Sequence, residues 1–94
     1  MALGEKWSER LADLLDLPRD VVLDLPRIIL TGNRRLVVEN HKGVIEYTSE
    51  LLRLNTAKGE LRIRGEGLVL PAIFREEVWV EGRLQQLEFY DWGD

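Results

Sequence analysis

The chain has 94 residues, enough for one domain with one modest core. It has no cysteine and one histidine, which excludes disulfide frameworks, thiol nucleophiles, cysteine-ligated metals and multi-histidine metal sites. The net charge is −4. Residues 1–26 contain three basic and six acidic side chains, residues 27–75 contain nine basic and five acidic ones, and residues 76–94 contain one basic and six acidic ones. A basic middle between acidic ends favours charge complementarity over a nucleic-acid surface, which usually carries strong net positive charge.

The first 26 residues predict an amphipathic helix followed by a stiff connector. Apolar residues recur at helical spacing along a face of about 12–14 residues. They are Leu3, Trp7, Leu11, Leu14 and Leu15. Pro18 ends the pattern and, with Pro26, stiffens the connector. We expect no signal peptide and no transmembrane segment, because no apolar run is long enough.

From residue 27 onward, short apolar runs with a period of two predict β-strands. About eight short strands are expected, at residues 28–31, 36–40, 44–48, 51–55, 61–64, 68–74, 78–81 and 84–90. The predicted organisation is a helix and connector in residues 1–26, a β domain in residues 27–90, and a short tail in residues 91–94.

The breaks between the runs recur every 16–17 residues, which predicts units of two strands each. They fall at Gly32, Ser49, Gly65 and Gly82, with a second series at Gly43 and Gly59. Two architectures have this rhythm: a β-solenoid of stacked coils, and an antiparallel sandwich or roll built from hairpins. The regular period favours solenoid-like stacking with the helix as an N-terminal cap, and the sandwich is the alternative.

Six residues are predicted to shape the turns, namely Gly32, Asn40, His41, Gly43, Gly65 and Gly82. His41 has carboxylates nearby in sequence and could act as a general base. However, no Ser or Cys nucleophile is placed near it by sequence. We therefore interpret His41 as a turn residue that hydrogen-bonds a neighbouring strand.

The tryptophans offer the first interface candidates. Val78 and Val80 should face inward, so Trp79 between them should point outward. An outward tryptophan on a strand is typical of an interface. The alternative is cover from the N-terminal helix through Trp7.

Arg53, Arg62 and Arg64 are the remaining interface candidates. Arg62 and Arg64 share a strand face, and Arg53 is placed on a neighbouring strand. No aromatic residues are interleaved for base stacking, so salt bridges to acidic strands explain them better than nucleic acid does. We expect Arg62 to be exposed.

No motif predicts catalysis, a metal ion or a cofactor. Glu76 and Glu77 are adjacent, and adjacent residues on a strand point to opposite faces, so a solvated corner explains this pair better than a metal or catalytic site. The Gly65–Gly67 corner is followed by a predicted strand, whereas a phosphate-binding loop leads into a helix. The sequence therefore predicts a protein that is not an enzyme, with no cofactor and no evident small-molecule substrate.

The proline-paired stretch 17–33 and the run Val38-Glu39-Asn40-His41-Lys42-Gly43 resemble the YabP/YqfC family of sporulation proteins, closest to its YqfC branch. Residues 59–65 and 80–84 follow the same rhythm, and the resemblance covers about residues 16–90. It implies a non-enzymatic protein made in the mother cell of endospore-forming bacteria, acting in spore envelope or coat formation. It also implies a membrane-protein partner, and a cytoplasmic location or a peripheral one at the forespore outer membrane.

Three functions remain open. The favoured one is a structural or assembly module that forms homo-oligomers through charge complementarity and open strand edges. The second is a nucleic-acid-binding regulator that uses an arginine surface. That surface would comprise Arg34, Arg35, Arg53, Arg62 and Arg64. The third is a small enzyme or ligand-binding protein, which would need a pocket with converging polar groups.

Overall fold

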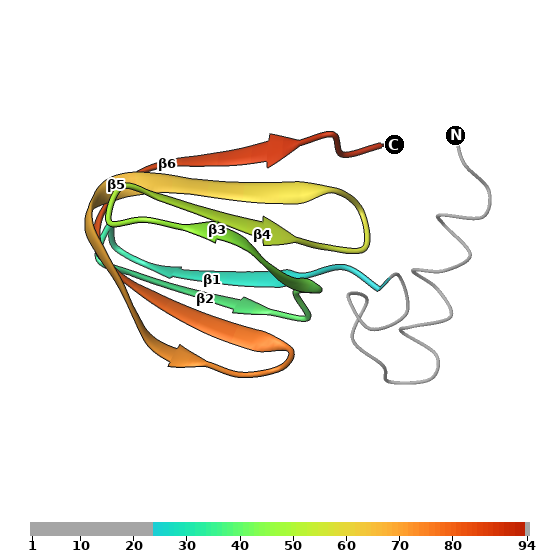
Figure 1. Cartoon of the computed structure of the whole chain (residues 1–94), viewed down its shortest axis with the longest axis horizontal. Coiled ribbons are helices and arrows are strands. Elements are labelled where there is room, and N and C mark those ends of the chain that lie inside the picture. The colour runs from blue at the N-terminus through green and yellow to red at the C-terminus, as the bar shows by residue number, and fades with distance from the viewer. Residues whose placement is uncertain (1–23, 94) are drawn as a thin grey trace.

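A computed structural model of the chain describes residues 24–93, which form one antiparallel sheet of six strands (Figure 1). The strands are β1 (Arg27–Thr31), β2 (Arg35–Glu39), β3 (Gly43–Tyr47), β4 (Leu51–Asn55), β5 (Glu60–Ile73) and β6 (Glu77–Tyr90). Their order across the sheet is β1-β2-β6-β5-β4-β3. The mainly β class predicted from the period-two runs is confirmed. The predicted N-terminal helix lies outside the described residues.

The two long strands, β5 and β6, bend at mid-length and fold the sheet into two layers. One layer contains β3, β4, the first half of β5 and the second half of β6. The other contains β1, β2, the first half of β6 and the second half of β5. Figure 1 shows the layers joined at the bend on the left and separating toward the right.

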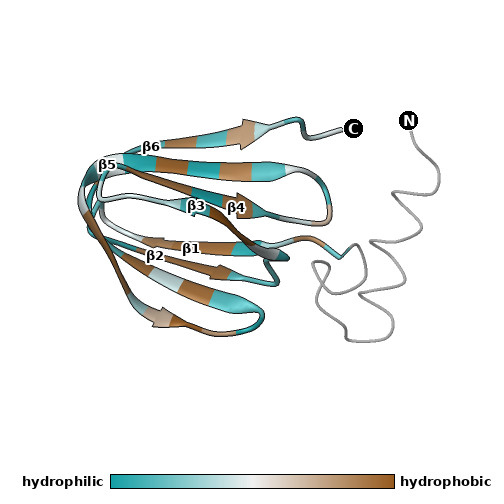
Figure 2. Cartoon of the chain, in the orientation of Figure 1, coloured by the Kyte–Doolittle hydropathy of each residue, from teal (hydrophilic) through white to brown (hydrophobic). Residues whose placement is uncertain are grey.

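The core fills the space between the layers. Strand alternation sends every second side chain inward, and Figure 2 shows the resulting bands of hydrophobic and hydrophilic residues along the strands. Both layers contribute fully buried side chains, which are Leu36, Val38, Leu52, Leu54, Leu61, Ile63, Leu68, Val78 and Val80.

Glycine permits the bend. A Cβ on Gly65 would collide with the carbonyl oxygen of Arg83 on the paired strand. A Cβ on Gly82 would lie 2.7 Å from the carbonyl oxygen of Gly67, and Gly82 has a φ of 144°. The two backbones therefore approach more closely than side chains would allow, and register shifts in the β5–β6 ladder follow the same stretch.

The solenoid-like stacking favoured from the sequence is wrong, because every strand pair is antiparallel. The sandwich alternative describes the fold. The expectation of eight strands is also wrong, because four of the runs join pairwise into β5 and β6. Glycine bends these strands without ending their pairing, since both partners bend together.

The period of 16–17 residues has a different origin from stacking. Gly32, Ser49, Gly65 and Gly82 all lie at the bent end of the sandwich. There the β3–β4 turn accepts hydrogen bonds from the β5 bend, with Leu68 N donating to Ser49 O at 2.8 Å. The β1–β2 turn accepts from the β6 bend in the same way, with Gly82 N donating to Arg34 O at 3.1 Å. Chain segments of equal length between these positions give the same sequence period whether the chain coils in one direction or runs back and forth between the two ends of the sandwich.

We predict that Gly65→Ala lowers the free energy of unfolding by at least about 2 kcal/mol, because the paired backbone must move apart. The matched control is Gly67→Ala, which has open space around its Cβ and a φ of 61°. That change should cost about 1 kcal/mol from backbone strain alone. Urea unfolding measures both, and equal losses would contradict the steric account of the bend.

Candidate functional site

One side of the sandwich is open between β3 and the second half of β5. Within residues 24–93, strand β3 pairs only with β4, and residues 69–73 pair only with β6. Two hydrogen bonds fix this side at its ends. His41 Nε2 donates to Phe74 O at 3.2 Å, and Tyr47 Oη donates to Leu68 O at 2.6 Å. Strand β3 therefore runs alongside β5 without pairing with it.

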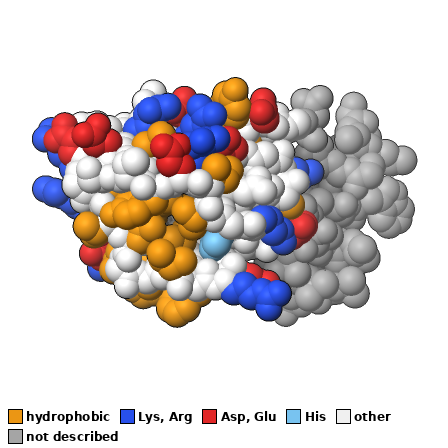
Figure 3. Space-filling model, viewed as in Figure 1, with side chains coloured by type: hydrophobic (Ala, Val, Ile, Leu, Met, Phe, Trp, Pro, Cys, Tyr) orange, Lys and Arg blue, Asp and Glu red, His pale blue; other side chains and the backbone are white. Residues whose placement is uncertain are grey.

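The open side is lined by accessible apolar residues, of which four point toward the core and the fifth, Phe74, follows the end of β5. We define it as Val44, Tyr47, Leu70, Ile73 and Phe74. Val44 and Tyr47 lie opposite the buried Leu54 and Leu52, and Ile73 lies opposite the buried Val78. Apart from Leu70, these side chains are 40–58% exposed. On the face drawn in Figure 3, hydrophobic side chains gather below a rim of charged ones. Such a patch is typical of an interaction site.

The two strands that border the open side, β3 and β5, form its rims. They suit insertion of a partner's side chains better than addition of a partner's strand. The β3 ladder is irregular between Val44 and Glu46. The β5 ladder is irregular between Val69 and Ala72, and Pro71 within this stretch has no N–H to donate. Because bulges and proline break the regular row of backbone donors and acceptors, an added strand would pair poorly here.

The turn from Asn40 to Gly43 positions the open side. Asn40 has a φ of 66°, and its N–H donates to Glu76 O at 2.6 Å. His41 is 3% exposed and uses both ring nitrogens. Its Nδ1 accepts from Gly43 N at 3.0 Å, so Nε2 carries the proton donated to Phe74 O. The turn thus joins the β5–β6 hairpin to the start of β3, and His41 lacks the free nitrogen of a general base.

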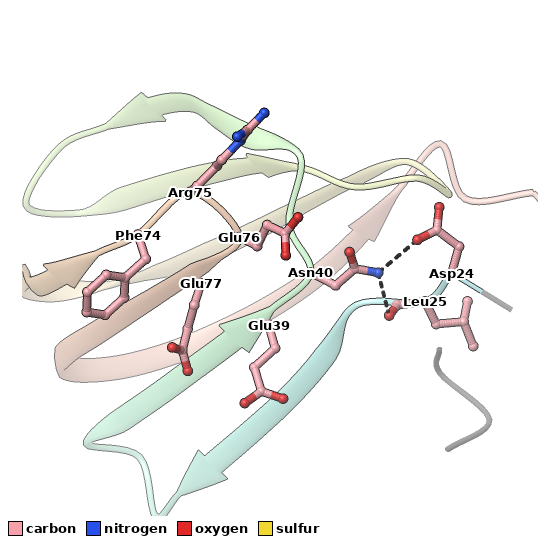
Figure 4. A pocket seen from close by; sticks show the side chains of 8 residues that line it. All are labelled: Asp24, Leu25, Glu39, Asn40, Phe74, Arg75, Glu76 and Glu77. Carbon is pink, nitrogen blue, oxygen red and sulfur yellow. Dashed lines mark hydrogen bonds between the residues drawn. The ribbon is translucent and has the colours of Figure 1, made fainter. Parts of the chain in front are cut away.

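A groove of about 810 Å³ lies beside this turn (Figure 4). It is lined by Asp24, Leu25, Glu39, Asn40, Phe74, Arg75, Glu76 and Glu77. Asn40 Nδ2 donates to Asp24 Oδ1 at 3.0 Å and to Leu25 O at 3.2 Å. The hydrogen bond from Asn40 and the charge of Lys42 lower the pKa of Asp24. Despite the many acids, no group of side chains in residues 24–93 is placed to hold a metal ion.

Three residues of the predicted arginine surface form ion pairs. Arg53, Arg62 and Arg64 lie together on the outer face of the layer that contains β4. Arg53 pairs with Glu60 and, at 3.1 Å, with Glu46. Arg62 pairs with Glu60 at 2.9 Å, and Arg64 with Glu88 at 2.6 Å.

Arg62 was expected to be exposed, and this expectation is wrong. Its side chain is 21% exposed and its guanidinium lies 3.8 Å from the ring centroid of Tyr90. Hydrogen bonds to Arg53 and then Arg62 lower the pKa of Glu60 from 4.5 to about 2. The arginines therefore form a cross-strand network that stabilises the layer.

Trp79 lies on the outer face of the other layer, half-buried. Its cross-strand neighbours are Val37 on β2 and Ala72 on β5, and Ile29 on β1 continues the row beyond Val37. The Arg35–Glu81 ion pair, at 2.8 Å, borders this row. The indole N–H of Trp79 has no hydrogen-bond partner within the described part of the chain. Trp7, the other predicted tryptophan contact, lies outside it.

Trp92, in the predicted tail, docks on the sheet. Its Nε1 donates to Glu60 O at 2.9 Å, and its ring packs edge-on against Phe89 with centroids 4.9 Å apart. A Cβ on Gly59 would lie 2.8 Å from this indole. Sequence reasoning missed this contact, and the open side with it, because both join residues far apart in the chain.

Comparison with known proteins places the described fold in a family. The YabP family model matches residues 24–93. This chain belongs to the YabP family. It is 34% identical over 77 residues to the Bacillus subtilis (strain 168) protein named "Uncharacterized protein YqfC", covering 82% of this chain and 83% of that protein. The resemblance drawn from the proline pair and the Glu-Asn-His-Lys-Gly turn is confirmed. Neither matching name describes an enzyme. No solved structure matches.

Within residues 24–93, this YabP family protein has no helix that could cross a bilayer. Of the predicted turn residues, Gly32, Asn40 and His41 lie in connections, Gly65 and Gly82 lie at the bends, and Gly43 is the first residue of β3. Of the predicted interface residues, Arg53, Arg62 and Arg64 share one outer face, whereas Trp79 lies on the other.

We predict that His41→Ala lowers the free energy of unfolding by about 2–4 kcal/mol, because it removes a buried side chain and its hydrogen bonds with Gly43 N and Phe74 O. The control is Lys42→Ala in the same turn, which removes exposed contacts to Asp24 at 3.5 Å and to Asn40 Oδ1 at 3.3 Å. That variant should lose under about 1 kcal/mol. Urea unfolding distinguishes them, and an unchanged midpoint for His41→Ala would contradict a structural role.

The pKa of Glu60 predicts how stability depends on pH. Because this pKa is lower in the folded chain than the ordinary 4.5, the network stabilises the fold above that pH. The contribution should fade as the pH falls toward about 2. In Glu60→Gln, the acid-side decline in urea midpoint should be shallower than in the wild type. Glu66→Gln, which removes an exposed pair with Arg83 at 3.8 Å, should leave the profile unchanged. Matching profiles for Glu60→Gln and the wild type would refute the assignment.

Proposed function

We propose that this YabP family protein is a non-enzymatic assembly module of sporulation, made in the mother cell and acting in spore envelope or coat formation. Membership of the family supports the sporulation role. The exposed apolar side between β3 and β5 is the observation that supports an assembly role. A small rigid sandwich that leaves core-facing side chains accessible is suited to receive another protein.

The partner proposed for the open side is a membrane protein, whose apolar side chains insert between Val44, Tyr47, Ile73 and Phe74. The irregular rims favour insertion of side chains, as when an amphipathic helix lies in a groove, over addition of a strand. This partner would hold the protein peripherally at the forespore outer membrane, on the cytoplasmic side of the mother cell.

The ion pairs weaken the case for a nucleic-acid-binding regulator. Binding phosphates would require Arg53, Arg62 and Arg64 to exchange carboxylate partners already within 3.2 Å. The counterion release that supplies most non-specific affinity would be reduced accordingly.

The proposal is tested by deleting the gene in the spore-forming host and restoring it with variants. Deletion should lower the yield of heat-resistant spores and leave vegetative growth unchanged. Ile73→Lys, which places a charge on the open side, should fail to restore spores at normal protein levels. We expect this change to weaken binding of the partner at least about tenfold, which is about 1.4 kcal/mol, and to lower the spore yield accordingly.

The matched control is Val69→Lys on the same strand. Val69 is 51% exposed and lies opposite Glu81 of β6, which places it on the outer face of the layer. It should restore sporulation fully. Normal sporulation after deletion would refute the sporulation role. Equal activity of Ile73→Lys and Val69→Lys would refute the open side as the partner site.

A further inference from the structure

The folded sheet has several unpaired edges, and all but one carry a feature that hinders pairing with another chain. Across residues 24–93 the edges are β1, β3, the second half of β5 and the second half of β6. The bulge in β3 and Pro71 in β5 break two of them. The β6 edge has Glu88 at the centre of residues 86–90, so self-pairing there would place like charges opposite each other.

Strand β1 has none of these features. Its five residues pair with β2 in an unbroken register from Arg27 to Thr31. Its sequence, Arg-Ile-Ile-Leu-Thr, has high β-propensity and a charge only at its first position. Ile29 is 40% exposed and Leu30 is 54% exposed. Natural proteins usually protect an edge of this kind unless it is used.

We propose that β1 is a self-pairing edge, through which two copies of this chain join antiparallel with Ile29 opposite Ile29 of the second copy. The proposal deepens the assembly role and rests on it for its biological meaning. The two sheets then continue into one across a two-fold axis, which is the commonest symmetry of homo-oligomers.

The side chains of β1 are self-complementary in this register. Arg27 falls opposite Thr31 of the second copy, so no like charges meet. Ile28 falls opposite Leu30, and both face the core side, since their β2 partners Val38 and Leu36 are fully buried. A shift of one residue in the pairing of the two edges would instead place the charged Arg27 opposite the apolar Leu30 of the second copy.

Pairing would also cover apolar surface on both faces. On the outer face, the row of Ile29, Val37 and Trp79 would continue into the same row of the second copy. On the core side, Leu30 borders an apolar slot of about 190 Å³ that reaches Leu36 and Leu84. Ile28 of the second copy would lie against Leu30 at the mouth of this slot.

Cysteine cross-linking tests the edge and its register, because the natural chain has no cysteine. In an antiparallel pair, directly opposite residues have Cα atoms about 4.5–5.5 Å apart, within disulfide range. Ile29→Cys should therefore form a disulfide-linked dimer under mild oxidation. Arg27→Cys and Thr31→Cys should each link poorly alone and efficiently when mixed. Ile45→Cys, on the other outermost strand, is the matched control and should remain monomeric.

Light scattering of the full chain across concentration provides the second measurement. The wild type should approach twice 10.9 kDa. Ile29→Lys, which sets two ammonium groups against each other, should raise the dimer dissociation constant at least about tenfold. Its β-sheet circular dichroism should be unchanged, and Ile45→Lys should still dimerise.

A monomeric wild type at every concentration, or cross-linking of Ile45→Cys as fast as Ile29→Cys, would overturn the self-pairing proposal. The spore assays of the open side do not depend on this result. Failure of dimerisation and failure of the proposed function are therefore separate outcomes.

Discussion

Close backbone contact at the glycines of β5 and β6 is the constraint on which the rest of the structure depends. At Gly65 and Gly82 the paired strands approach to distances that a side chain would block. Because both strands bend there together, one sheet becomes two layers and gains an interior. Without the bend, Leu61 and Ile63 could not share a core with Val78 and Val80. The turns at the bent end then hydrogen-bond to the bends and fix them.

The same bend creates the surfaces assigned to function. A sheet folded once closes on the bent side and leaves its outermost strands unpaired. The gap between β3 and β5 is spanned by the His41 and Tyr47 hydrogen bonds, which hold the layers together while leaving Val44 and Ile73 accessible. Among the described residues, the outer edge of β1, the other outermost strand, is also unpaired. The fold thus separates a site suited to apolar side chains from one suited to backbone pairing.

The outer faces of the layers differ in chemistry. One carries the network around Glu60, where arginines and glutamates on adjacent strands satisfy each other within the monomer. The other carries the apolar row through Trp79, bordered by the Arg35–Glu81 pair. Part of the positive charge in the middle of the chain is thereby paired within the monomer. Glu60 binds Arg53 and Arg62, and Glu88 binds Arg64 across the β5–β6 pair.

The sequence by itself determined the β class, the strand positions to within a few residues, the turn role of Asn40 and the family. These depend on local patterning and on motifs read along the chain. Tertiary structure alone decided that the repeated units run back and forth instead of stacking, since equal arm lengths give one period in either case. It also decided that Arg62 packs on Tyr90, that Trp92 docks on Gly59, and that β3 and β5 border an open apolar side. Each of these joins residues distant in sequence, and the glycine bend sets their distances.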